Sequence, residues 1–257
     1  MTALTILGSC SGTEPMPGRN HTSLALQAGE NLYFFDAGES CSRTAHLAGL
    51  ELLRTKAIFL SHTHYDHVGG LPGLLWNIRK LSKRGKTEPC YLPIPLYIPE
   101  PEAFAGIREM LCHTEGAFDY GAFVETRLPR AGTIYDDGTL RVAAVPNGHL
   151  APLPDGTPRS FSYRIEAGGK RVVFSGDVKA PEELLPLMEG GCDLLMHETG
   201  HHAVADVCRF AADAGAARLV LLHHGRAILE QRPSVAEALR EARIPVTVAS
   251  DGEKIEW

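Results

Sequence analysis

The sequence lacks the features that mark membrane-spanning or secreted proteins. No window approaches the roughly 18 uninterrupted apolar residues of a membrane span. The amino terminus has no positively charged stretch followed by an apolar run, so no signal peptide is expected. The six cysteines lie far apart without a CxxC pair, which favours free thiols over a disulfide framework. These absences predict a cytoplasmic protein.

An excess of positive charge is also missing. Lys and Arg number 25 against 31 Asp and Glu, which gives a formal net charge of −6. This balance provides no general attraction for polyanions, so nucleic-acid binding would need a local patch. The one basic run, residues 79–86, contains five cations. Its competing interpretation is a solvated helix end, where cations complement the helix dipole.

Length and composition predict one α/β domain spanning residues 1–257. A chain of 257 residues is near the upper limit for a single core, and 44% hydrophobic with 22% charged residues is ordinary globular composition. No linker, tandem repeat or low-complexity tract divides it. Short strands mixed with amphipathic helices indicate sheets packed between helices.

Apolar and β-branched runs broken by Gly, Pro and Asn predict the strands, and helical spacing predicts the helices. Strands are expected at residues 3–7, 22–27, 32–36, 56–61, 96–98, 140–145, 160–166, 171–175, 193–196, 218–222 and 246–249. Helices are expected at residues 68–81, 102–111, 204–214 and 234–242. Ser234 is the expected N-cap of the last helix, and Asp251-Gly252 predicts a tight hairpin turn.

The chain is rich in histidine, with 12 in all. The most informative histidines form a cluster that directly follows the expected buried strand 56–61. Residues 61–67 read Ser-His-Thr-His-Tyr-Asp-His. In an extended chain His62 and His64 point to the same side, while Asp66 and His67 lie where the helix begins. The segment therefore offers two nitrogens to one metal and a carboxylate oxygen plus a nitrogen to another. A solvated histidine-rich turn is the competing interpretation.

Four residues cannot complete two metal sites, and further candidate ligands stand at other strand ends. His149, Asp177 and His223 each follow an expected strand. Each alone could be a cap or a satisfied core group, but beside the cluster the metal interpretation is favoured. Imidazole and carboxylate suit zinc, and also manganese or iron. A carboxylate between two metals is typical of sites that hydrolyse phosphate or acyl esters.

These motifs resemble the metallo-β-lactamase fold superfamily over essentially the whole chain. Residues 62–67 match its HxHxDH signature, Asp36-Ala37-Gly38 resembles its Asp-x-Gly, and Ser175-Gly176-Asp177 resembles its motif with the bridging Asp. The resemblance implies a four-layer αββα sandwich with the site at one edge of two facing sheets. It also implies the ligands: His62, His64 and His149 for the first metal, Asp66, His67 and His223 for the second, and Asp177 shared by both.

Within that superfamily the chain resembles ribonuclease Z and its phosphodiesterase relatives. The resemblance lies in Gly12-Thr13, the loop 15–20 ending in Arg19-Asn20, the strand 161–165, Met196-His197-Glu198 and Gly200-His201. Departures are Pro17 where the family usually has Lys, and Ser162 in place of Gly. His149 and Asp177 stand only 28 positions apart, which leaves no room for the arm that grips tRNA. RNA remains a candidate substrate, and the missing arm argues against tRNA.

The resemblance implies hydrolysis by a hydroxide held between two divalent cations, which lower the pKa of bound water toward roughly 7. Asp66 would orient this nucleophile or take its proton. His201, oriented by Glu198, would protonate the leaving oxygen; an ordinary helix turn is its competing interpretation. Arg19, Asn20 and Tyr65 are the candidates for substrate contact, although a plain turn explains Arg19 and Asn20 equally well.

The leading hypothesis is a phosphodiesterase with a dinuclear zinc centre, acting on a nucleotide or an RNA-type phosphodiester. Mn²⁺ and Fe²⁺ are alternative metals. One competing hypothesis is hydrolysis of a carbon ester, lactone, thioester or β-lactam at the same centre. Another is a metal-binding or sensor protein without turnover. No membrane partner is expected, and the sequence is compatible with a homodimer.

Overall fold

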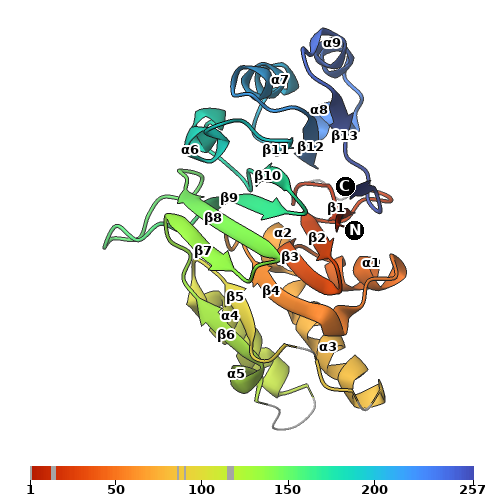
Figure 1. Ribbon diagram of the computed structural model, residues 1–257, viewed down its shortest axis with the longest axis vertical. Coiled ribbons are helices and arrows are strands. Elements are labelled where there is room, and N and C mark those ends of the chain that lie inside the picture. Colours follow the sequence, from red (N-terminus) through yellow and green to blue (C-terminus); the bar gives the residue numbers. More distant parts are fainter. Residues whose placement is uncertain (1, 13–15, 86, 90, 115–118) are drawn as a thin grey trace.

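Two β-sheets face each other in the computed structural model of the chain (Figure 1). The structure describes residues 2–12, 16–85, 87–89, 91–114 and 119–257. Within these residues the first sheet contains, in spatial order, β14 (Lys254–Glu256), β1 (Thr2–Gly8), β2 (Ser23–Ala28), β3 (Asn31–Ala37), β4 (Thr55–Phe59), β5 (Ile94–Tyr97) and β6 (Val124–Arg127). The second contains β13 (Val246–Val248), β12 (Leu219–His224), β11 (Leu194–Thr199), β10 (Lys170–Phe174), β9 (Phe161–Ala167), β8 (Leu140–Pro146) and β7 (Gly132–Asp136).

Helices cover the outer face of each sheet, which gives the four layers of an αββα sandwich (Figure 1). The first sheet packs against α1 (Cys41–Leu47), α2 (Tyr65–Val68), α3 (Leu71–Gly85), α4 (Pro101–Cys112) and α5 (Tyr120–Phe123). The second packs against α6 (Leu185–Met188), α7 (Val204–Asp213), α8 (Arg226–Leu229) and α9 (Pro233–Glu241). The expected fold class is confirmed. None of the described helices is both long and apolar enough to cross a bilayer.

Strand alternation distributes the apolar side chains among three layers of core. In β4, Phe59 faces the opposite sheet while Ile58 faces the helices. Phe59 stacks on Phe35 with ring centroids 4.9 Å apart, and both are fully buried between the sheets. Burying one such side chain stabilises the fold by about 2–3 kcal/mol. Both sheets are therefore held by the same inner layer.

The strand directions bring four strand ends to one edge of the sandwich. β10, β11 and β12 are parallel, and β8 runs with β10 because both are antiparallel to β9. The end of β4 joins the same edge: Phe161 N donates to Ser61 O at 2.9 Å, and the Tyr163 hydroxyl donates to Leu60 O at 2.6 Å. The segments that follow β4, β8, β10 and β12 therefore meet.

Two expected details of the carboxyl-terminal region are wrong. Helix α9 begins at Pro233 with Arg232 as its N-cap, so Ser234 lies inside the first turn. Proline favours this first helical position because its fixed φ is already helical. Asp251-Gly252 does form a turn, but it connects strands of different sheets and so makes no hairpin. The Asp251 carboxylate instead accepts a hydrogen bond from Ser9 N at 2.9 Å.

Sequence reasoning missed three strands, the short helices α1, α5, α6 and α8, and one helix boundary. The edge strands β6 and β14 and the outermost strand β7 carry mostly exposed or half-buried side chains, so their apolar signal is weak. The expected helix 68–81 is divided into α2 and α3 at Gly69-Gly70. The break leaves Asp66 and His67 on the short helix α2, separate from the longer helix α3.

Candidate metal centre

A buried carboxylate, Asp36, holds the loop that carries the histidine motif. Its Oδ1 accepts from Ser61 N at 2.6 Å, and its Oδ2 accepts from Ser61 Oγ at 2.8 Å. Oδ2 also lies 2.7 Å from His67 Nδ1. Asp36 has φ of 56°, a left-handed conformation that costs about 1–2 kcal/mol in a non-glycine residue. Because this bond uses His67 Nδ1, Nε2 is the ring atom left to bind a ligand.

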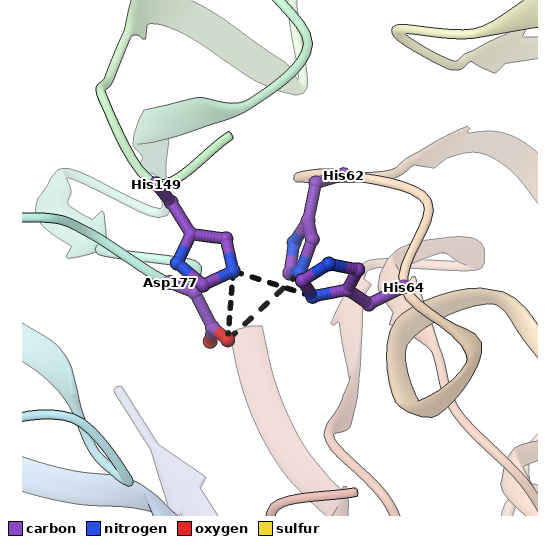
Figure 2. Close-up of side chains that lie close together, drawn as sticks. All are labelled: His62, His64, His149 and Asp177. Carbon is purple, nitrogen blue, oxygen red and sulfur yellow. Dashed lines mark hydrogen bonds and ion pairs between the residues drawn. The ribbon is translucent and has the colours of Figure 1, made fainter. Parts of the chain in front are cut away.

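The first group of side chains comes from the β4 loop, the β8 end and the β10 end. His62, His64, His149 and Asp177 each present one atom, and these four atoms lie within 4.8 Å of one another (Figure 2). Asp177 Oδ2 is 3.8 Å from His62 Nε2 and 3.6 Å from His149 Nε2. His149 Nε2 is 3.3 Å from His64 Nδ1. Three nitrogens and one oxygen therefore converge on one point.

The second group lies next to the first and shares its carboxylate. Asp66, His67 and His223 present atoms within 4.8 Å of one another. Asp66 Oδ2 is 3.1 Å from His223 Nε2 and 3.4 Å from His67 Nε2. Asp177 faces this group with Oδ1, 3.4 Å from His67 Nε2, and also lies 3.4 Å from His223 Nε2 through Oδ2. Asp177 therefore contacts both groups.

The hydrogen bonding of these atoms fits metal ligation. Among the described residues, His62 Nε2, His67 Nε2 and Asp177 Oδ1 are buried and have no hydrogen-bond partner. Each buried, unsatisfied polar group costs about 1–3 kcal/mol. A divalent cation at each group would satisfy these atoms, and imidazole and carboxylate are ligands that zinc accepts. The donor set therefore suits divalent metals.

Burial and nearby charges shift the pKa values of two neighbouring histidines, His62 and His67, in opposite directions. Burial, followed by the charge on His67, lowers the pKa of His62 well below its ordinary value. Burial also disfavours charge on His67, but the carboxylates of Asp177 and Asp36 outweigh it and raise the pKa of His67. Burial opposes ionisation of Asp177, yet the surrounding histidines hold its pKa well below the usual range. The shared carboxylate is therefore ionised.

Glu198 and His201 form a pair next to the shared carboxylate: His201 Nδ1 lies 3.8 Å from Asp177 Oδ2. His201 Nδ1 lies 3.1 Å from Glu198 Oε1, and His201 N donates to Oε2 at 2.9 Å. Burial disfavours the Glu198 carboxylate, but bonds from His201 and His202 lower its pKa to about 2. The same bond from Glu198 raises the pKa of His201. His201 also groups with Asp177 and His223, so its position suits either an acid or a ligand.

Of the three candidates for substrate contact, Arg19 and Asn20 are hydrogen-bonded within the protein, whereas Tyr65 is exposed. Arg19 Nη1 donates to Ser9 Oγ and to Ala249 O, both at 2.8 Å. Asn20 Nδ2 donates to Thr44 Oγ1 at 3.1 Å. Both side chains thus tie the amino-terminal loop to the rest of the protein. Tyr65 is 68% exposed at the start of α2, beside Asp66, where its ring is available to a ligand.

The structure gives a steric reason for one glycine of the family pattern, Gly12. A Cβ on Gly12 would lie 2.5 Å from Cγ of Asp66, so only glycine allows the backbone to approach this carboxylate.

The neighbouring Thr13 and Pro15 lie outside the described residues, as does Lys86 of the basic run. In the described part of that run Arg79 is buried, and Lys80 lies over the Trp76 ring at 5.1 Å.

Sequence reasoning missed a carboxylate that links two of the ligand-bearing loops. Glu183 Oε1 accepts from Gly148 N at 2.9 Å, and Oε2 accepts from Lys179 N at 3.0 Å. Glu183 thereby ties the residue before His149 to the segment after Asp177. The available signal is the Pro-Glu-Glu start of a short 3₁₀ helix, where a third-position Glu often reaches back to the preceding backbone. Nothing local indicates the bond to Gly148.

A two-sheet sandwich with histidines and aspartates gathered at one edge defines a class of metal-dependent hydrolases. The match to a family model places this chain within that class. Residues 33–224 match the model described as beta-lactamase superfamily domain, which is most of the chain, so the chain belongs to this superfamily. The match includes both groups of candidate ligands. The family implies divalent metal ions.

Individual relatives and solved structures agree with this assignment. Ribonuclease Z of Methanothermobacter thermautotrophicus is 28% identical over 98% of this chain and 95% of that protein. Ribonuclease Z of Synechococcus sp. is 30% identical over 86% of each. Human tRNase Z, short form, has a TM-score of 0.70 at 26% identity over 99% of this chain and 98% of that chain. The metallo-beta-lactamase fold protein YhfI of Bacillus subtilis has a TM-score of 0.74 at 19% identity, over 99% and 98%.

The expected resemblance to a ribonuclease Z-like hydrolase of the metallo-β-lactamase fold is confirmed by these matches.

Proposed function

We propose that the chain is a phosphodiesterase that uses two divalent metal ions, zinc being the first candidate and Mn²⁺ or Fe²⁺ the alternatives. His62, His64 and His149 would hold one ion, and Asp66, His67 and His223 the other. Asp177 would bind both. The substrate class is a nucleotide or RNA-type phosphodiester, which the ribonuclease Z relatives support. We propose that the protein acts in the cytoplasm, and a homodimer remains a prediction.

The observation that carries this proposal is the placement of the Asp177 carboxylate. It is 2% exposed, and its two oxygens approach imidazoles of both groups. A buried carboxylate among five histidines of two groups needs compensating positive charge. Two cations provide it, and bridging carboxylates are typical of two-metal hydrolases.

The bound ions would lower the pKa of a water molecule and polarise the scissile phosphoryl oxygen. Asp66, whose Oδ2 contacts both histidines of its group, is suited to orient the attacking water. His201 is suited to protonate the leaving oxygen from Nε2, because Glu198 engages its Nδ1 and favours the protonated form. The exposed Tyr65 ring is suited to contact a base or another flat substituent.

The test combines metal analysis with a substrate panel. Protein reconstituted with zinc, manganese or iron is assayed on a phosphodiester, a lactone, a thioester, a β-lactam and a tRNA precursor. We expect about two metal ions per chain and turnover of the phosphodiester. Two metals without turnover of any substrate would favour a metal-binding protein, and turnover of the carbon esters alone would favour that second kind of hydrolase.

Asp177→Ala is the matching variant for the metal assignment. Loss of the shared ligand should lower the bound metal below that of the wild-type protein. Asp213→Ala is the control, because Asp213 is an exposed carboxylate paired with Arg243. Unchanged metal content in the Asp177 variant, measured by elemental analysis, would contradict the shared ligand.

A further inference from the structure

A cavity beside the candidate metal centre has an apolar wall and a polar rim. It has a volume of about 850 Å³, and His149 and His201 lie along it. We call it the His149 cavity. Its apolar lining includes Leu150, Ala151, Pro152, Pro158 and Val178. Small-molecule sites in proteins commonly measure about 300–1,000 Å³ and combine apolar walls with a few polar groups. A nucleoside therefore fits this cavity in size and chemistry.

Among the described residues, Glu183 is the acidic side chain that lines this cavity, and its carboxylate is already engaged. Both oxygens of Glu183 accept backbone N–H groups, from Gly148 on one wall and from Lys179 on the other. A third N–H, that of Ala180, lies 3.4 Å from Oε2. These bonds hold the carboxylate in the cavity wall and fix the distance between the loops that carry His149 and Asp177.

Lys179 is the lysine that lines this cavity, and its methylene stem is packed against the wall. A Cβ on Gly148 would lie 3.4 Å from Cδ of Lys179, so the stem runs along the backbone next to His149. The residue is exposed, and its ammonium group forms no hydrogen bond or ion pair with the described residues. A lysine packed by its methylene groups with a free head presents its charge to solvent or to a ligand.

We propose that Lys179 is a specificity-determining residue that binds a second phosphate on the substrate. A nucleoside in the His149 cavity would separate this phosphate from the scissile diester at the metal centre. The inference rests on the proposed phosphodiesterase function and adds a substrate class to it, nucleotides with phosphate groups at both ends of the sugar. An ammonium group is suited to this task because it binds phosphate as a compact point charge.

Binding of two ligands that are not turned over tests the inference directly. The metal-loaded protein is titrated calorimetrically with thymidine 5′-monophosphate and with thymidine 3′,5′-bisphosphate. We expect the bisphosphate to bind about tenfold more tightly, as one charge-assisted contact allows. Lys179→Met keeps the stem and should abolish this preference, and Lys179→Arg should restore most of it. Lys83→Met, which removes an exposed charge from α3, should leave the preference unchanged.

Turnover of the matching 4-nitrophenyl esters separates the two proposals. For Lys179→Met we expect KM to rise about tenfold for thymidine 3′-phosphate 5′-(4-nitrophenyl phosphate), with kcat nearly unchanged. The ester without the 3′-phosphate should be unaffected. Equal wild-type affinity for both ligands, or an equal loss for both in the variant, overturns the role of Lys179 while hydrolysis still supports the phosphodiesterase. A bisphosphate preference without hydrolysis of either ester supports the Lys179 site and overturns the phosphodiesterase.

Discussion

At the scale of single residues, the site depends on carboxylates that hold histidines in one orientation. Asp36 fixes His67, and Glu198 fixes His201, in each case through Nδ1. A hydrogen bond at one ring nitrogen sets which nitrogen faces the ligand, and such partners tune metal affinity as strongly as many direct contacts. The residues behind the histidines therefore merit testing as much as the histidines themselves.

Asp36→Asn should weaken both the fold and the metal site. The substitution removes the charge that His67 and Ser61 share, so we expect a loss of about 2–3 kcal/mol in unfolding free energy. Apparent zinc affinity should fall about 10–100-fold. Urea unfolding in the presence of a chelator measures the first effect, and competition with a chromophoric chelator measures the second. Unchanged zinc affinity would show that His67 needs no such support.

His201→Ala should reveal an acid by its dependence on the leaving group. Because the bond to Glu198 raises the pKa of His201, the protonated form persists to higher pH than in an ordinary histidine. Cleavage of an ester with a poor, alkyl leaving group should therefore decline as pH rises through this pKa, and the variant should lack this decline. The 4-nitrophenyl ester has a leaving group that needs little protonation, so its rate of cleavage should fall much less in the variant.

The His201→Ala experiment has two controls: the metal content of the variant, and a second variant at a histidine far from the site in sequence. The variant should keep its metals by elemental analysis, and His46→Ala, an exposed position on α1, should alter neither ester. Loss of metal in the His201 variant would assign the residue as a ligand instead. Equal losses on both esters would also exclude the acid role.

At the scale of elements, the convergence of the candidate ligands could be predicted because each belongs to a local pattern. His62, His64, Asp66 and His67 follow the buried strand β4, His149 and Asp177 follow β8 and β10, and His223 lies near the end of β12. Contacts between distant loops could not be predicted in this way. The bond from Gly148 to Glu183 joins residues 35 positions apart and leaves no periodic signal. Strands such as β7 escaped because their exposed side chains resemble those of a loop.

A polar cluster joins β3, β4 and β7 through Asp137. Its Oδ2 accepts from Tyr33 at 2.7 Å and Tyr135 at 2.8 Å, and Lys56 Nζ lies 2.9 Å away. Burial opposes the charge on Asp137, but bonds from the Leu140 backbone, Tyr33 and Lys56 hold its pKa well below the usual range. Asp137→Asn should therefore cost about 1–3 kcal/mol in unfolding free energy at pH 7.

The pH dependence of that loss follows from the sign of the shift. A carboxyl group with a lowered pKa in the folded state stabilises the protein above its unfolded value near 4, and this stabilisation is lost as pH falls below it. The difference between wild type and Asp137→Asn should thus be constant near neutral pH and shrink below about pH 4. Urea titrations across this range measure it, and a difference that grows on acidification would contradict the assignment.

At the scale of the whole molecule, the candidate ligands come from both sheets, so a bound metal would join the two halves of the sandwich. The inner apolar layer also draws residues from both halves of the chain. This supports our proposal that residues 1–257 form one domain. A ligand that binds only the folded state stabilises it in proportion to the logarithm of its concentration over its dissociation constant.

Removal of metal should therefore lower the thermal stability of the whole protein. At a zinc concentration 100 times the dissociation constant, binding contributes about 2.7 kcal/mol per site. For a domain of this size the midpoint of unfolding should fall by about 5–10 °C per site when a chelator is added. Differential scanning calorimetry measures the shift. Asp177→Ala should show little dependence on zinc, whereas a full shift in that variant would argue against its role.

The strand β14 gives this fold a particular order of assembly. Residues 254–256 pair with β1, and Thr2 and Trp257 exchange backbone hydrogen bonds. During synthesis, β1 would therefore be an edge strand of the first sheet, unpaired on one side, until the whole second sheet had been translated. Until then β1 would offer an unpaired rim to any neighbouring polypeptide, and this interval is where a chaperone would be of most use to the protein.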